Sequence, residues 1–443
     1  MNVQLLHLQN PWWRNRTFID EDEKVKEALS QSPQMTYYFK EEGNKIIIGP
    51  RQVGKTTYFK LLIRDLLINK KIDPKNILFF SCEPLSSKNE LIELIKTYFE
   101  QPTTEGKRYI FLDEITNIDL WEQALKFWID MGKFNENRIF VSGSSGFFLK
   151  RGFERLPGRP IKHKLFLPLS FREYLLQFAS NELQKMIEGI NIGITSLNSV
   201  YKLMPFTEEL NKHFNSFLIT GGVLKAIYEY KRTESLSSET YQTYLNWVKG
   251  DMSRLNRSES ILKQIVKGIV KTYSTRYSLT AIAKDLGIPC HKTVSEYLDE
   301  MEALFLIRNQ YAMDISRGIL SYKKNRKSFF IDPFFYNAFK GWIMGVFKPY
   351  SFEDAAKVIE GIIMESLSRA YGEVTYFYKE RETDFIIKEG NAYTGIELKW
   401  QDSVKASDFQ NYKIFKNRIL LSKDTLKFEE VKIVPVPMFL SLF

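Results

Sequence analysis

The sequence predicts an α/β fold built on a parallel sheet with helices on both faces, followed by helical segments and a second α/β domain at the C-terminal end. Short apolar runs typical of fully buried strands alternate with stretches whose apolar residues recur at helical spacing. This alternation is typical of a doubly wound sheet. A chain of 443 residues is also too long for one core, and we expect about three domains or more.

Each element of the first domain follows from its own pattern of apolar residues and breakers. The expected strands lie at 46–48, 77–82, 108–114 and 138–145, and the expected helices lie at 59–70, 91–99 and 121–131. Residues 170–260 show helical spacing throughout, with a break at Gly221-Gly222. Ser170 and Glu173 have the spacing of a capping box that opens the first of these helices.

The composition is that of an ordinary globular protein, with 44% hydrophobic and 26% charged residues. No apolar stretch reaches the roughly 18 residues of a membrane span, and the N-terminal residues lack the order of a signal peptide. Two cysteines in unrelated contexts indicate a reducing compartment, so we expect a cytoplasmic protein without a cysteine zinc site. The net charge of +10 permits an anionic partner without requiring one.

The stretch after the first strand has the spacing of a phosphate-binding loop. Glycines at both ends let backbone N–H groups close around polyphosphate oxygens, while the following helix directs its positive N-terminus at them. Lys55 is expected to reach the outer phosphates of ATP, and the Thr56 hydroxyl to ligate Mg²⁺. The residues expected to hold the nucleotide are Gly49, Pro50, Arg51, Gln52, Val53, Gly54, Lys55, Thr56 and Thr57.

Two carboxylates follow a later buried strand and complete the predicted chemistry. Asp113 is placed to hold magnesium, directly or through water, and Glu114 to polarise the attacking water. Ser142 or Ser144, after the next strand, either senses the terminal phosphate or forms a turn. Arg159 either offsets charge on the γ-phosphate, in its own or a neighbouring subunit, or is a surface arginine.

Residues 279–286, a turn at Gly287–Pro289 and residues 291–303 have the pattern of a helix-turn-helix, and a strand is expected at 304–310. His291, Lys292, Thr293 and Ser295 begin the second helix, where base or phosphate contacts are expected. The later acidic residues of that helix argue against deep insertion in a groove. Basic residues then predict either a DNA-contacting wing or a solvated loop, and they are Arg317, Lys323, Lys324, Arg326 and Lys327.

The C-terminal part combines one apolar helix with a hairpin that carries charged residues. Glu365 lies on the helix, Asp384 begins one strand, and Glu397 and Lys399 share one face of the next strand. Two carboxylates and a lysine at a sheet can hold Mg²⁺ or Mn²⁺ and position water against a phosphodiester. Taken singly, Asp384 or the Glu397 and Lys399 pair would indicate only a solvated strand face.

Together these motifs resemble a family of AAA-like ATPases of archaea and bacteria that end in a restriction-endonuclease-like domain. The resemblance rests on GPRQVGKTT, FLDE, GRP, LPLSFREYL, the Gly221-Gly222 pair, FIDPFFYNAF and the two C-terminal strands. It implies ATP binding by Lys55 and Thr56, catalysis through Asp113 and Glu114, and Arg159 in the family's arginine position. It also implies a nuclease fold of the PD-(D/E)xK type, with Glu365, Asp384, Glu397 and Lys399 in its motif positions.

The predicted architecture therefore has four parts. These are an N-terminal arm and P-loop ATPase core at 1–165, a helical lid at 166–260, a winged helix-turn-helix at 261–330 and a nuclease-like α/β domain at 335–443. The interpretation is an ATP-dependent enzyme that binds branched, forked or single-stranded DNA, cuts it with a metal ion, and can assemble as a homo-oligomer. The alternative is a regulatory NTPase switch whose last domain binds DNA or protein without cutting.

Overall fold

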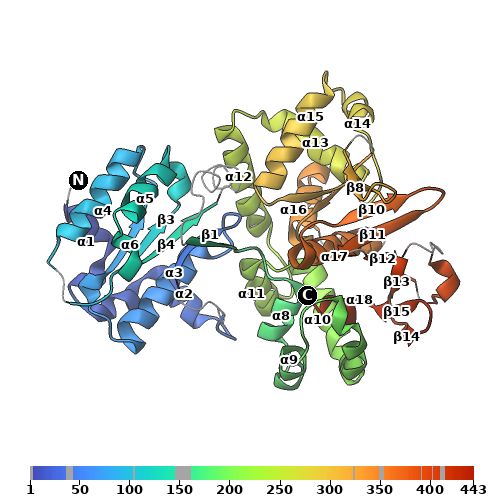
Figure 1. Cartoon of the computed structure of the whole chain (residues 1–443), viewed down its shortest axis with the longest axis horizontal. Coiled ribbons are helices and arrows are strands. Elements are labelled where there is room, and N and C mark those ends of the chain that lie inside the picture. The colour runs from blue at the N-terminus through green and yellow to red at the C-terminus, as the bar shows by residue number, and fades with distance from the viewer. Residues whose placement is uncertain are drawn as a thin grey trace. The chain divides into compact units, whose positions relative to one another are not determined.

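The computed structural model describes residues 3–35, 43–102, 105–144, 161–322, 325–348, 354–390, 392–401, 403–409 and 415–443. The chain divides into two compact units (Figure 1). The first unit contains Met1–Leu167 together with Ala303–Phe305, and the second contains Pro168–Glu302 together with Leu306–Phe443.

The first unit is a parallel α/β core preceded by an N-terminal arm. Its strands are β1 Asn44–Ile48, β2 Ile77–Ser81, β3 Tyr109–Asp113, β4 Arg138–Gly143 and β5 Ile161–Leu165. Its α-helices are α1 Val3–Gln9, α2 Glu23–Ser30, α3 Lys55–Arg64, α4 Lys88–Glu100, α5 Trp121–Asp130 and α6 Lys133–Glu136. Its other helical turns are η1 Pro11–Trp13, η2 Arg16–Glu21, η3 Asp65–Asn69, η4 Pro74–Asn76 and η5 Ile115–Asn117.

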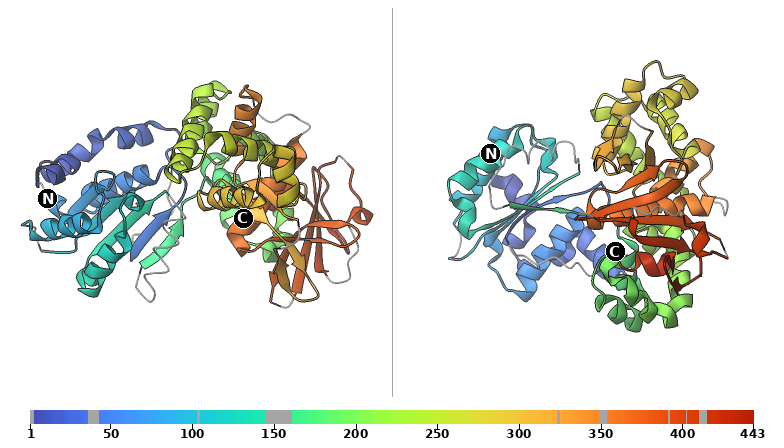
Figure 2. Two further views of the ribbon diagram at one scale, coloured as in Figure 1. Left: turned by 90° about the horizontal axis from the view of Figure 1, so that it is seen from above. Right: turned by 45° about the vertical axis from the view of Figure 1, so that its right-hand side comes forward.

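The five strands run parallel in the order β2-β3-β4-β1-β5, which confirms the predicted sheet. Successive residues of each strand point to opposite faces, so the apolar runs supply two separate cores. On one face Leu78 and Ile110 pack among the side chains of α4 and α5. On the other, Phe79 and Phe111 pack among those of α3. Figure 2 shows the helices on both sides of this sheet.

The N-terminal arm is anchored along β2, the edge strand of the sheet. The Asn10 side chain donates a hydrogen bond to the carbonyl oxygen of Phe79 and accepts one from its N–H. The indole N–H groups of Trp12 and Trp13 both donate to the carbonyl oxygen of Ile77. The arm therefore pairs backbone groups that an exposed strand edge leaves open.

The second unit begins with a wholly helical region, as expected from its periodicity. Its helices are α8 Phe171–Phe178, α9 Asn181–Glu188, η6 Ile194–Phe206, α10 Thr207–Thr220, α11 Leu224–Thr233 and α12 Ser238–Arg254. The predicted capping box is present, because the Ser170 hydroxyl accepts from the N–H of Glu173 and the Glu173 carboxylate accepts from the N–H of Ser170.

A three-helix segment follows and leads into two short strand pairs. Its elements are α13 Glu259–Lys271, α14 Leu279–Leu286, α15 His291–Ala303, β6 Ile307–Gln310, β7 Ala312–Asp314, β8 Ile319–Ser321 and β9 Lys327–Phe330. β6 pairs with β9 in an antiparallel ribbon. β7 instead pairs with β10 of the C-terminal sheet, so the chain between the ribbon strands extends that sheet.

The prediction that basic residues here form a DNA-contacting wing is wrong for Arg326 and Lys327. The side chain of Lys327 is 1% exposed and that of Arg326 is also buried, so neither is available to DNA phosphates. Burial follows because both residues belong to the point where the ribbon joins the larger sheet. Arg317 is exposed, and Lys323 and Lys324 lie outside the described residues.

The C-terminal part is a mixed sheet backed by helices, and the order of its strands is β14-β15-β13-β12-β11-β10-β7-β8. Its strands are β10 Thr375–Tyr378, β11 Glu382–Glu389, β12 Ala392–Lys399, β13 Phe415–Ser422, β14 Lys427–Phe428 and β15 Lys432–Pro435. Its helices are α16 Pro333–Met344, α17 Ala355–Tyr371, η8 Ala406–Asp408 and α18 Val436–Leu440.

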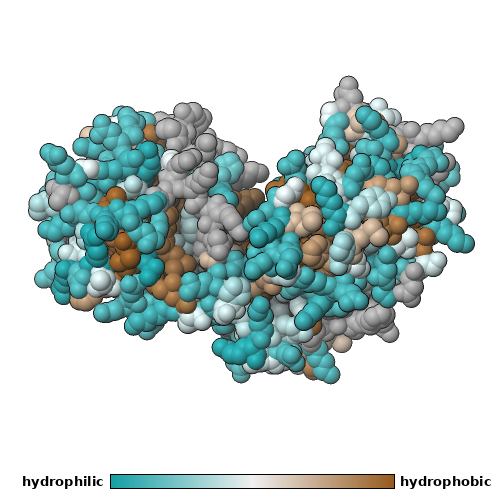
Figure 3. All heavy atoms as spheres, turned by 90° about the horizontal axis from the view of Figure 1, so that it is seen from below, coloured by the Kyte–Doolittle hydropathy of each residue, from teal (hydrophilic) through white to brown (hydrophobic). Residues whose placement is uncertain are grey.

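Hydrophilic side chains dominate the face shown in Figure 3, where hydrophobic ones gather in patches. Among the helices of the described ranges, none combines the length and hydropathy that a membrane crossing requires.

Candidate active site

The phosphate loop joins β1 to α3, a helix of ten residues whose first residue is Lys55. The turn needs left-handed backbone at two places. Gly54 has φ +99° and Gln52 has φ +61°. Glycine adopts this conformation without strain, whereas Gln52 adopts it at a cost that functional sites commonly carry.

The first glycine of the loop is required by a close approach. A Cβ atom on Gly49 would lie 1.8 Å from the carbonyl oxygen of Phe166. The N–H of Phe166 also donates to the carbonyl oxygen of Ile48 at 2.6 Å, just after the end of β5. The loop therefore rests directly on the backbone of the chain that leaves the sheet.

Lys55 lies folded over the loop with its side chain 3% exposed. Its ammonium group donates to the carbonyl oxygens of Gly49 at 2.9 Å and Pro50 at 2.7 Å. The same nitrogen lies 3.8 Å from Oε1 of Glu114. The ammonium and the N-terminus of the helix both attract anions, whereas the nearby Glu114 carboxylate offsets part of that positive charge.

Asp113 ends β3 and is held from two sides. The Thr56 hydroxyl donates to Oδ2 at 2.7 Å, and the Ser142 hydroxyl donates to Oδ1. The Asp113 side chain is buried, with 3% of the residue exposed. These hydrogen bonds fix the carboxylate next to the hydroxyl that was predicted to share a metal ion with it.

Glu114 follows with φ +53°, a left-handed backbone conformation that is strained for any residue other than glycine. Its N–H donates to the Ser142 hydroxyl at 3.1 Å, and the Ser144 hydroxyl donates to Oε2 at 2.7 Å. Both predicted serines therefore bind the carboxylate pair instead of forming an unconnected turn.

Strand order explains why these groups meet. β4 lies between β1 and β3, with Ile47 opposite Ser142 and Leu112 opposite Val141. The carboxyl ends of three parallel strands thus bring the phosphate loop, the two carboxylates and the two serines to one edge of the sheet. Arg159 lies outside the described residues.

These residues fit magnesium and ATP. The Gly49 position has no space for a side chain, Gly54 takes a backbone conformation suited to glycine, and Lys55 caps the loop. Thr56 and Asp113 offer a hydroxyl and a carboxylate oxygen, the hard oxygen ligands that Mg²⁺ prefers.

A second group of charges lies in the other unit, where one lysine faces three carboxylates. The Lys327 ammonium is 2.9 Å from Oε1 of Glu360, 2.5 Å from Oε1 of Glu382 and 3.9 Å from Oδ1 of Asp384. Arg276 supplies further positive charge, 2.6 Å from Oε2 of Glu382. The ammonium thus occupies the centre of this carboxylate group.

One carboxyl group of this cluster, that of Glu360, has a raised pKa. Burial raises the pKa of Glu360 to about 7, with Asp384 and Glu382 acting in the same direction and Lys327 opposing them. Burial alone would lower the pKa of Lys327, but Glu360, Asp384 and Glu382 outweigh it and raise that pKa. Lys327 therefore stays charged while Glu360 titrates near neutral pH.

Glu365 has different neighbours from those predicted. Its Oε2 binds Nε of Arg308 at 2.8 Å and its Oε1 binds Nε of Arg369 at 3.0 Å. Burial would raise the pKa of Glu365, but the two arginines outweigh burial and lower it. Both carboxylate oxygens are therefore engaged, and the helix carboxylate that shares Lys327 with Asp384 is Glu360.

The hairpin carries Asp384 on β11 and Glu397 and Lys399 on β12. Phe385 pairs with Ile396, so the next step of the antiparallel ladder places Asp384 opposite Glu397. Lys399 lies 3.8 Å from Oε2 of Glu397. Asp384 Oδ2 accepts from the N–H of Leu398 at 2.9 Å. In the described ranges, no group of three or more His, Cys, Asp and Glu side chains has the arrangement of a metal site.

Sequence reasoning missed Lys327, Glu360 and Glu382 as members of this group. Glu382 precedes Asp384 by two residues, so alternation along a strand gives a signal for it. Lys327 belongs to a strand about 57 residues before Asp384, and no local pattern connects the two.

Three stretches of the chain match known domain families. Residues 41–175 match an AAA domain, residues 211–344 match a domain of unknown function, DUF8612, and residues 356–439 match another, DUF4143. The chain therefore contains a P-loop ATPase domain of AAA type, and this domain supports ATP hydrolysis. The two other matches attach no activity to the second unit.

The chain is also similar to uncharacterized protein MJ1637 of Methanocaldococcus jannaschii, with 25% identity over 299 residues. The match covers 64% of this chain and 59% of the relative, so the chain spans about three fifths of the relative's length.

Solved structures with detectable similarity include the Thermotoga maritima RuvB Holliday junction branch migration motor and the Aeropyrum pernix ORC1 protein in complex with DNA. The first has 16% identity and a TM-score of 0.28, covering 71% of this chain and 92% of that one. The second has 13% identity and a TM-score of 0.28, covering 75% and 96%. Scores this low carry no argument about the function of the present chain.

The titration of Glu360 gives a testable pH dependence. Because its pKa is raised from 4.5 to about 7, its stabilising contribution is complete at low pH and declines as pH rises through 7. Glu360→Gln should make the fall in unfolding free energy between pH 5 and pH 8 shallower, by at most about 1.4 kcal/mol per pH unit.

The measurement is urea unfolding at several pH values, with Glu365→Gln as the matched control on the same helix. The pKa of Glu365 is lowered, so its contribution is lost only at acidic pH and its removal should not flatten the slope. Identical slopes for Glu360→Gln and the unmodified chain would contradict this assignment.

Proposed function

We propose that the protein is an ATP-hydrolysing switch in which the first unit turns over ATP and the second unit holds the partner. The observation that carries the proposal is the hydrogen-bonded group formed by Thr56, Asp113, Ser142, Glu114 and Ser144 beside Lys55. Its members come from two strand ends and one helix, yet each has a hydrogen bond that fixes its direction.

The roles follow from these hydrogen bonds. Lys55 and the N-terminus of α3 would hold the phosphates, while Thr56 and Asp113 would hold magnesium, which would neutralise phosphate charge. Glu114, held by Ser144, orients the attacking water and accepts its proton. Ser142 keeps the two carboxylates together, because it binds the side chain of one and the N–H of the other.

Lys55→Ala should lose ATP binding, because the buried ammonium is removed from the phosphate loop. Glu114→Gln should keep ATP binding but lower turnover by a factor of about 100 or more, as expected when a general base is lost. The measurements are equilibrium binding of ATP and steady-state phosphate release. Gly250→Ala is the control, since a Cβ there meets nothing within 4 Å. Normal turnover by Glu114→Gln would refute the role of this residue.

DNA is the partner that we propose for the second unit. Lys263, Lys267 and Lys271 form an exposed row on α13 at intervals of four residues, and of these Lys271 is paired with Asp285. A row of positive charge on one helix face fits a phosphate backbone, and it replaces the wing as the expected DNA-binding surface.

Reversing these three charges should weaken DNA binding. The slope of log affinity against log salt should become shallower by about one for each DNA phosphate that no longer has a lysine partner. Binding is measured by fluorescence anisotropy over a range of salt concentrations. A control variant with Lys185, Lys202 and Lys212 reversed changes the net charge equally elsewhere in the unit. Equal effects of the two variants would mean that α13 is not the DNA-binding surface.

Metal-dependent DNA cleavage is the second candidate for the second unit. The register that places Asp384 opposite Glu397, with Lys399 beside it, favours cleavage. The ammonium of Lys327 among the carboxylates favours the alternative, a domain that binds without cutting.

If the domain cuts, the full chain should cleave single strands, duplexes, forks or four-way junctions with Mg²⁺ or Mn²⁺. Asp384→Ala and Lys399→Ala should abolish that cleavage, whereas Asp424→Ala, at an exposed position, should not. Absence of cleavage with every substrate and both metals, or full activity of Asp384→Ala, would leave the binding role.

A further inference from the structure

The chain first passes from the first unit to the second through five residues, 166–170, which we call the connector; it later returns to the first unit for Ala303–Phe305 alone. At its first residue the connector is fixed to the phosphate loop. The carbonyl oxygen of Phe166 fills the space where Gly49 would carry a side chain, and its N–H binds Ile48. The ring of Phe166 also packs against that of Tyr58 on α3, with ring centroids 5.8 Å apart.

The next residues of the connector are fixed within the second unit. The carbonyl oxygen of Pro168 accepts from Nη1 of Arg369 at 2.8 Å, and the N–H of Leu169 donates to the carbonyl oxygen of Gly222 at 2.9 Å. A Cβ atom on Gly222 would lie 2.0 Å from the carbonyl oxygen of Leu169. Close backbone packing of this kind leaves no room for the connector to shift alone.

The partners of the connector belong to one buried polar group, which we call the node. Its members are Gly222, Asp332, Glu365 and Arg369. Asp332 Oδ2 accepts from the N–H of Gly222 at 2.8 Å, and Asp332 Oδ1 accepts from the N–H of Phe334 at 2.8 Å, at the start of α16. Gly221 also lacks space, since a Cβ there would lie 1.7 Å from Oδ1 of Asp332.

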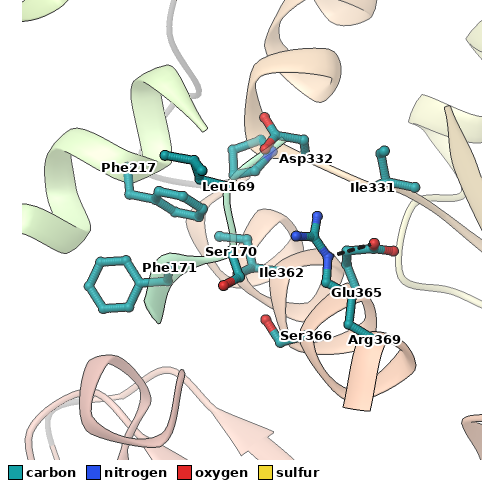
Figure 4. Close-up of a pocket in the computed structure, with 11 residues that line it drawn as sticks. Leu169, Ser170, Phe171, Phe217, Ile331, Asp332, Ile362, Glu365, Ser366 and Arg369 are labelled. Carbon is teal, nitrogen blue, oxygen red and sulfur yellow. Dashed lines mark hydrogen bonds and ion pairs between the residues drawn. The ribbon is translucent and has the colours of Figure 1, made fainter. Parts of the chain in front are cut away.

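Figure 4 shows the connector residues Leu169 and Ser170 beside Asp332 and the Glu365–Arg369 pair, whose ion pair is drawn as a dashed line. The remaining cavity has a volume of about 10 Å³, which is room for one water molecule. Among the described residues, the space beside the node is therefore too small for a ligand larger than water. The node instead packs tightly around the connector.

This arrangement gives a structural role to three sequence motifs. LPLSFREYL contains the last four residues of the connector and the start of α8, the N–H of Leu169 binds the second residue of the glycine pair, and FIDP supplies Asp332. None of them contributes a group to the ATPase site. The matched AAA domain continues to residue 175, beyond the connector.

We propose that residues 166–170 transmit the nucleotide state of the phosphate loop to the node, so that ATP binding regulates the second unit through the chain itself. The proposal rests on the proposed ATPase function and names its regulation. A nucleotide regulates the second unit by this route only if it changes how the loop packs against Phe166. The close approach at Gly49 means that the loop has no free space toward the carbonyl oxygen of Phe166. The close packing at Gly222 then transmits the displacement of the connector to α10 and α16.

The test is hydrogen exchange of the full chain carrying Glu114→Gln, with and without MgATP. We expect ATP to change exchange in segments 217–224 and 329–336, which contain the node. Adding Gly222→Ala should remove that difference while the affinity for ATP stays within about threefold of the parent. Adding Gly250→Ala in place of Gly222→Ala, a matched change on α12 with open space around it, should preserve the difference.

Arg369→Lys provides a second variant in case Gly222→Ala fails to fold. It keeps a positive charge beside Glu365 but loses the planar fork that also reaches Pro168, so the difference should fall by half or more. ATP binding without any exchange change at the node, or a full change in both variants, would overturn the inference alone. Failure of the parent to bind ATP would overturn the proposed function as well.

Discussion

The ATPase site depends on the way Asp113 is held. Its two oxygens accept hydrogen bonds from Thr56 on one strand–helix junction and from Ser142 on a neighbouring strand. A buried carboxylate is costly unless it is fully hydrogen-bonded, and these two hydroxyls supply the bonds. The same Ser142 oxygen accepts from the N–H of Glu114, which holds the backbone of this residue in its strained conformation. Removing the Ser142 hydroxyl would take one hydrogen bond from each of these two residues at once.

In the second unit, buried carboxylates are neutralised by arginine and lysine side chains, whereas Asp113 in the first unit is held by hydroxyl groups. Glu365 is held by two arginines, and three carboxylates share Lys327. Removing one partner of such a group leaves an uncompensated charge and costs about 3–5 kcal/mol. The charges that made this domain resemble a nuclease are therefore also the charges that keep it folded, and a residue pattern alone does not separate the two roles.

Sequence reasoning predicted the parallel core well because its signals are local. The Ile46–Ile48 run, the loop spacing and the two carboxylates after β3 are each visible within a few residues. The strand β5 escaped a definite assignment, since Ile161–Leu165 is interrupted by basic residues. The pairing of β7 with β10 and the burial of Lys327 depend on packing between distant parts of the chain, which a local pattern does not contain. The helix periodicity likewise did not separate Glu360 from Glu365, because each directly follows an apolar residue on the same helix.

The first unit is expected to hydrolyse ATP with magnesium held by its own hydroxyl and carboxylate groups. Phosphate release by the purified full chain, compared in excess Mg²⁺ and in EDTA, measures this without any substitution. Turnover should require Mg²⁺ and should saturate with ATP. Phosphate release that continues unchanged in EDTA, or no release although ATP binds, would contradict this role of Thr56 and Asp113.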